Sequence, residues 1–121
     1  MKKDYIEFMG LRLALKTKEK IQLEEQIGNP LTYILSMVGG AMNEEEIDLT
    51  AFQLPPLKVM ITTIHVASQR YEHGISKEKV MDIIDECLDI EGNSVMSLFT
   101  DVFMKLLMNG KYIPQTEEVQ E

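Results

Sequence analysis

The side chains that could carry chemistry in this chain are two histidines, one cysteine and several groups of acids. His65 and His73 lie eight residues apart on one expected helix, slightly more than two turns, which is too far for both to bind one metal ion. His65 is expected at the edge of the core, and His73, beside Gly74, at the C-terminal end of that helix. Cys87 falls on an apolar helical face among acids, which favours a small buried hydrophobic residue over a nucleophile.

The carboxylates give no stronger sign of catalysis or of metal binding. Residues 44–48 include three consecutive acids, which do not converge on one side of any regular element and do not follow EF-hand spacing. Asp82, Asp85 and Glu86 lie on the polar face of their expected helix, where solvation explains them better than acid–base catalysis. No phosphate-binding loop, nucleophile elbow or dinucleotide fingerprint is present. The sequence therefore predicts no catalytic residue, no cofactor and no metal, and hence a protein that is not an enzyme.

Composition and charge narrow the function classes further. The 121 residues are enough for one domain, and a single cysteine excludes an internal disulfide. Twenty acidic against twelve basic residues give a net charge of −8, which argues against nucleic-acid binding. No apolar run approaches the length of a membrane span, and no signal peptide follows the N-terminal lysines. We therefore expect a cytoplasmic protein without nucleic-acid or membrane partners.

The last expected helix, Ser94 to Asn109, is apolar almost all the way round. A helix needs only one apolar stripe to pack on a small domain, so this one is either central to the core or shared with another chain. The chain also contains nine methionines, whose flexible side chains serve both as core filler and on adaptable binding surfaces. We therefore expect a homo-oligomer, and a partner or self-association surface made of Met96, Phe99, Phe103, Met104, Leu107 and Met108.

The N-terminal third of the chain predicts a hairpin followed by two helices. Residues 4–16 alternate apolar and polar on both sides of Met9-Gly10, which is typical of a β-hairpin. Thr17 is the expected N-cap of a helix from Lys18 to Ile27 that ends at Gly28. Asn29 and Pro30 then open a short helix that reaches Val38 before Gly39-Gly40.

An acidic connection, residues 41–54, leads into the helical second part of the chain. A long helix is expected from Pro55-Pro56 to His73, closed by Gly74. Ser76 caps the next helix, a break at residues 91–93 follows, and the final helix ends at Gly110. The predicted fold class is α+β, predominantly helical: an N-terminal two-stranded β-hairpin and about five helices. Residues 1–110 form a single domain, and residues 111–121 a flexible acidic C-terminal tail.

The order of these elements resembles the tail assembly chaperones of long-tailed bacteriophages and prophages, especially those of Gram-positive hosts. The resembling residues are the hairpin, Thr17 and the helix ending Leu23-Glu24-Glu25-Gln26-Ile27-Gly28, then Gly74-Ile75-Ser76-Lys77-Glu78 opening a helix, a Gly-containing break and an apolar last helix. The similarity covers roughly residues 4–110. Its motifs are ordinary capping sequences, so the order of elements carries the resemblance.

The resemblance implies a role in virion assembly. Such chaperones bind and solubilise the tape measure protein before the tail tube polymerises around it. An extended form made by ribosomal frameshifting recruits tail tube protein. The chaperone acts in the host bacterial cytoplasm and is absent from the mature virion.

The alternative is a small acidic adaptor or inhibitor of a host protein, of the kind that mimics DNA. Mimics distribute carboxylates over a surface, whereas here the acids cluster at residues 44–48, 82–91 and 117–121. The clustering fits a DNA mimic poorly, and the chaperone remains the favoured interpretation.

Overall fold

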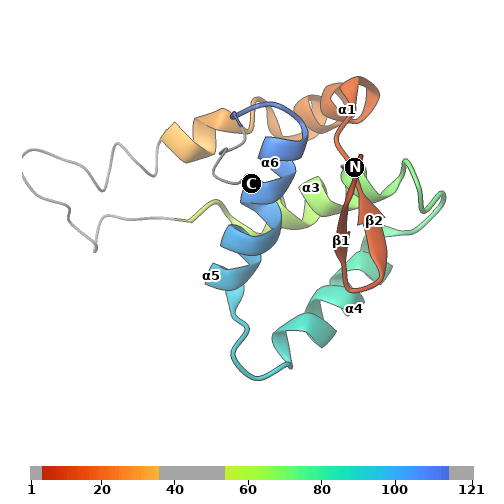
Figure 1. Ribbon diagram of the computed structural model, residues 1–121, viewed down its shortest axis with the longest axis vertical. Coiled ribbons are helices and arrows are strands. Elements are labelled where there is room, and N and C mark those ends of the chain that lie inside the picture. The colour runs from red at the N-terminus through yellow and green to blue at the C-terminus, as the bar shows by residue number, and fades with distance from the viewer. Residues whose placement is uncertain (1–3, 36–53, 115–121) are drawn as a thin grey trace, which may run out of the picture.

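The computed structural model describes residues 4–35 and 54–114 of the 121-residue chain. Within these residues a two-stranded antiparallel hairpin is followed by helices (Figure 1), which confirms the predicted α+β, predominantly helical fold class. The expected end of the short helix at residues 38–40, and the acidic connection up to residue 53, lie outside the described residues.

The hairpin pairs β1 (Ile6–Phe8) with β2 (Leu11–Leu13), with Phe8 opposite Leu11 and Ile6 opposite Leu13. Met9 and Gly10 form the two-residue turn, and both have positive φ, 49° and 85°. Positive φ at both central positions matches the right-handed twist of the strands, which explains why so short a loop suffices. Leu13 is fully buried, so the apolar face of the hairpin packs on the helices.

Helix α1 (Thr17–Ile27) begins one residue earlier than the sequence predicts, and its N-cap residue is Lys16 instead of Thr17. The reason lies in Glu19, whose Oε1 accepts the Lys16 backbone N–H at 3.1 Å. Gly28 ends the helix as expected, with a φ of 79° and its N–H bonded to the Glu24 carbonyl. Residues 31–35 are helical, and the Asn29 side chain accepts the Leu31 N–H at 2.9 Å.

Helix α3 (Leu57–Ser68) is the centre of the fold, packing against α1, α4, β2 and the π turn described below. It ends five residues before the predicted end at His73. The Ser68 hydroxyl donates to the His65 carbonyl at 2.7 Å, and the Gln69 amide donates to the same oxygen at 3.2 Å. These side-chain bonds compete with the regular helical pattern, and the chain turns toward the hairpin.

Helix α4 (Lys77–Leu88) begins at the predicted cap, because the Ser76 hydroxyl accepts the Lys79 N–H at 3.0 Å. The expected break follows, and Ser94 then caps the last helical stretch. That stretch comprises α5 (Val95–Leu98), a π turn η2 (Phe99–Phe103) and α6 (Met104–Asn109), where the sequence predicts one uniform helix. In the π turn the Met104 N–H bonds to the carbonyl of Phe99, five residues earlier.

The π turn lets the last stretch pack on two sides. Residues four apart drift by about 40° around an α-helix, and the wider π turn reverses that drift. One row of residues therefore packs in the larger core cluster, which includes Leu23 and Ile64. A second row packs in a smaller core cluster with Val59 and Met60. The first row is Leu98, Val102 and Leu106, and the second is Phe99, Phe103 and Leu107.

The folded domain extends beyond the predicted boundary at residue 110. Tyr112 and Ile113 pack against the core, and the Tyr112 hydroxyl donates to Glu24 Oε2 at 2.6 Å. Burial first, and then the bond to Glu24, raises the pKa of Tyr112 above its usual range. Tyr112 and Ile113, which the sequence analysis assigned to the tail, are therefore packed on the domain, and residues 115–121 lie outside the described residues.

Candidate interaction surface

The structure divides the six residues of the predicted association surface into two groups. Phe99, Phe103 and Leu107 are buried inside the domain, with 4%, 0% and 0% of their surface exposed. They belong to the core cluster around Val59 and Met60, so they cannot form a contact surface in this conformation.

The remaining three residues, all methionines, reach the surface. Met96 is 46% exposed, and Met104 and Met108 are half-buried. Met104 also packs against the smaller core cluster, so its side chain continues this cluster toward the surface. The candidate surface is therefore narrower than the sequence predicts: an edge of α5 and α6 formed by methionine side chains.

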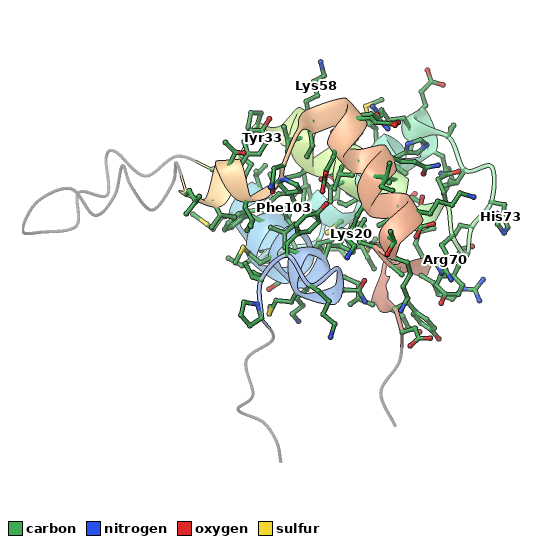
Figure 2. The ribbon with its side chains drawn as sticks, turned by 90° about the horizontal axis from the view of Figure 1, so that it is seen from above. Lys20, Tyr33, Lys58, Arg70, His73 and Phe103 are labelled. Atoms are coloured by element: carbon green, nitrogen blue, oxygen red, sulfur yellow. The ribbon has the colours of Figure 1, made fainter. Side chains whose placement is uncertain are left out.

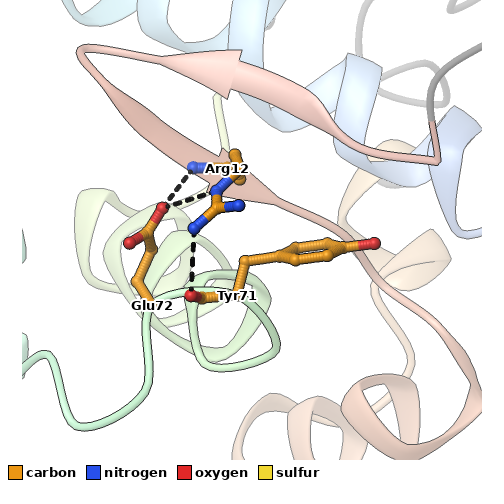
Figure 3. Close-up of polar contacts among 3 residues, drawn as sticks. All are labelled: Arg12, Tyr71 and Glu72. Carbon is orange, nitrogen blue, oxygen red and sulfur yellow. Dashed lines mark hydrogen bonds and ion pairs between the residues drawn. The ribbon is translucent and has the colours of Figure 1, made fainter.

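Two rings and two charges hold the hairpin against the segment that follows α3, and the sequence analysis missed them. The Glu72 Oε2 accepts both the Arg12 backbone N–H at 3.1 Å and the Arg12 Nε–H at 3.2 Å, and the guanidinium also lies 3.4 Å from the Tyr71 carbonyl (Figure 3). The Arg12 guanidinium lies over the Tyr71 ring, 5.3 Å from its centroid, and Tyr5 meets that ring edge-on. The backbone and side chain of Arg12 lower the pKa of Glu72 below its ordinary 4.5.

This contact predicts a pH dependence. A carboxyl whose pKa is lower in the folded state stabilises the fold above its unfolded pKa, and the contribution disappears as the pH falls through the folded pKa. Glu72→Gln should therefore lower the free energy of unfolding at neutral pH, and its difference from the wild type should shrink below about pH 4.5, the ordinary pKa of the group. Urea denaturation from pH 7 to pH 3 measures this. A difference that stays constant over that range would contradict the assignment.

The other candidate residues of the sequence analysis are placed apart from one another. His65 is half-buried at the core edge as predicted, with Nε2 3.0 Å from the Ile75 carbonyl oxygen. His73 is exposed, but it does not lie at a helix end, because α3 ends at Ser68. Cys87 is buried as predicted, and Asp82, Asp85 and Glu86 are exposed on α4.

Neither metal clusters nor membrane-spanning helices occur in the described part of the chain. Over residues 4–35 and 54–114, no three His, Cys, Asp or Glu side chains gather closely enough to hold a metal ion. Among the helices in the same ranges, none combines the length and apolar character needed to cross a membrane.

Comparison with known proteins finds no match for this chain, in sequence or in structure. No family model, no curated protein and no solved structure matches this chain.

Proposed function

We propose that this protein is a non-enzymatic tail assembly chaperone of a long-tailed bacteriophage or prophage, which binds and solubilises the tape measure protein. On this proposal an extended, frameshifted form recruits tail tube protein. The chaperone then acts in the host bacterial cytoplasm and does not remain in the mature virion.

The observation that carries the proposal is the order of elements that gave the resemblance. A hairpin leads directly into α1, which ends at Gly28, and later Ser76 opens α4 ahead of a turn and an apolar last helix. The exposed methionine edge of α5 and α6 supports it further, because flexible thioether side chains fit irregular apolar partners. A long helical client would supply such a partner.

Co-expression tests the proposal. The chain should raise the soluble fraction of the tape measure protein encoded beside it, measured by centrifugation of the lysate. Met96→Glu, at a side chain 46% exposed, should reduce this effect by placing a charge in the apolar contact. Met81→Glu is the matched control, because Met81 is 39% exposed on α4, outside the candidate surface.

Truncation separates the tail from the chaperone activity. The chain should be cut after Pro114, because Tyr112 and Ile113 belong to the folded domain. The truncated chain should solubilise the client as well as the full chain does. If the tape measure protein stays equally insoluble with and without this chain, the chaperone proposal is wrong and the acidic-adaptor interpretation is favoured.

A further inference from the structure

A surface pocket of about 500 Å³ lies between α1 and the segment that follows α3. Lys18 and Gln22 line it from α1, and Gln69, Arg70, Tyr71 and His73 line it from the other side. Figure 2 shows Arg70 and His73 on the same side of the molecule, away from Lys58. The volume falls in the range of sites that hold a small ligand or several side chains.

The pocket offers hydrogen-bond donors and positive charge. Its one acid, Glu19, is only 3% exposed and is already engaged: Oε1 accepts the Lys16 N–H at 3.1 Å and lies 3.6 Å from an Arg70 nitrogen. Gln69 is also engaged, because its amide donates to the His65 and Ile75 carbonyls. The other five side chains that line the pocket each carry an N–H or O–H donor. Lys18 and His73 are exposed. Such a lining is complementary to a carboxylate-bearing ligand, because charge-assisted bonds from Lys and Arg to carboxylates are the strong ones.

The chain itself carries such a ligand. Its net charge is −8, and Glu117 and Glu118 stand together near its end. A cationic pocket on an acidic protein therefore complements the acidic segment of a neighbouring copy.

The geometry of α1 favours a neighbouring copy over the same chain. Lys20 donates to the Gly110 carbonyl at 2.7 Å, and Glu24 accepts from Tyr112, so the end of the described chain is held on the Lys20–Glu24 face. Lys18 and Gln22 line the pocket from a different face, because two residues along a helix correspond to a rotation of about 200°. Gly110 and Tyr112, close to the end of the described residues, therefore lie on the far side of α1 from the pocket.

We propose that the pocket lined by Lys18, Arg70 and His73 binds the acidic segment containing Glu117 and Glu118 of a second copy of this chain. This contact is separate from the methionine edge and does not depend on the chaperone function. It makes self-association electrostatic, so the association should weaken as salt shortens the Debye length from about 10 Å at 0.1 M to about 3 Å at 1 M.

Charge exchange between two variants tests the proposal. The pocket variant is Lys18→Glu with His73→Glu, which leaves the Arg70–Glu19 contact intact and places an acid in the first turn of α1, where it is favourable. The tail variant is Glu117→Lys with Glu118→Lys. Each variant alone should self-associate about tenfold more weakly than the wild type in sedimentation velocity at low salt. An equimolar mixture should regain association, because each pocket then faces a segment of opposite charge.

A matched control separates a specific contact from a general effect of net charge. Lys58→Glu with Lys79→Gln changes the net charge by the same amount as the pocket variant, at exposed positions that do not line this pocket. It should associate like the wild type, and circular dichroism should show all variants folded. A wild type that is monomeric at low salt, a control as weak as the pocket variant, or a mixture that regains nothing would each overturn the proposal.

Discussion

Replacing Phe103 by alanine should lower the free energy of unfolding by about 3–5 kcal/mol, the usual cost of removing a buried Phe side chain. Phe103 is fully buried in the smaller core cluster, and its ring stacks with that of Phe99 at a centroid distance of 5.8 Å. The cost combines the lost transfer of the ring out of water with the cavity left between the π turn and α3. Urea denaturation followed by circular dichroism measures it.

The loss expected for Phe103→Ala is large compared with the total stability of a single domain. Single domains are stable by only about 5–15 kcal/mol, so the expected loss is a large fraction of the total free energy of unfolding. Met96→Ala is the matched control on the same helical stretch, because Met96 is 46% exposed and leaves no buried cavity. A loss for Phe103→Ala as small as that of the control would place the ring outside the core.

Asn109→Ala should cost about 1–3 kcal/mol, because it leaves a buried donor without a partner. The Asn109 Oδ1 accepts the backbone N–H of Leu15 at 2.8 Å, and Leu15 is 1% exposed. The Asn109 amide also donates to the Asp4 carbonyl at 3.1 Å, so one side chain ties both ends of the hairpin segment to α6. Urea denaturation measures the cost, and amide exchange at Leu15 reports the lost bond directly.

Asn93→Ala provides the comparison. The Asn93 amide donates to the Cys87 carbonyl at 2.9 Å, but that carbonyl also accepts the Ile90 N–H at 3.1 Å. Truncation at residue 93 therefore leaves no orphaned group and should cost less than truncation at residue 109. Equal costs for the two variants would show that Leu15 finds another acceptor.

The Met9-Gly10 turn, the Gly28 and Ser76 caps and the apolar helical face that carries Cys87 were all predictable from the sequence. Each depends on residues within a few positions of one another, as alternation, capping and helical spacing do. The mistakes at the helix ends are different in kind. The early end of α3 depends on Ser68 and Gln69 bonding to a helical carbonyl, and the turn that follows is held by Arg12, sixty residues away from Glu72.

The candidate surface shows the same division. Spacing predicted that the last helical stretch carries more apolar residues than one stripe needs, and all six residues chosen from it were plausible contact residues. The packing of α3 against the π turn decided that Phe99, Phe103 and Leu107 lie inside and that Met96 reaches the surface. A helical pattern gives the angle of a side chain around its own axis, but not the number of neighbours that cover it.

The sequence by itself therefore determined the order of the elements, the caps at Gly28 and Ser76 and the sign of the overall charge, because these depend on local spacing and composition. The tertiary structure alone decided that a cationic pocket forms from Lys18 on α1 and Arg70 and His73 after α3. Lys18 lies more than fifty positions before Arg70 and His73 in the sequence. These residues meet only because burial of Leu23 and Ile64 in one core draws α1 against α3. Long-range contacts of this kind follow from packing energy summed over the whole domain, and no local pattern records them.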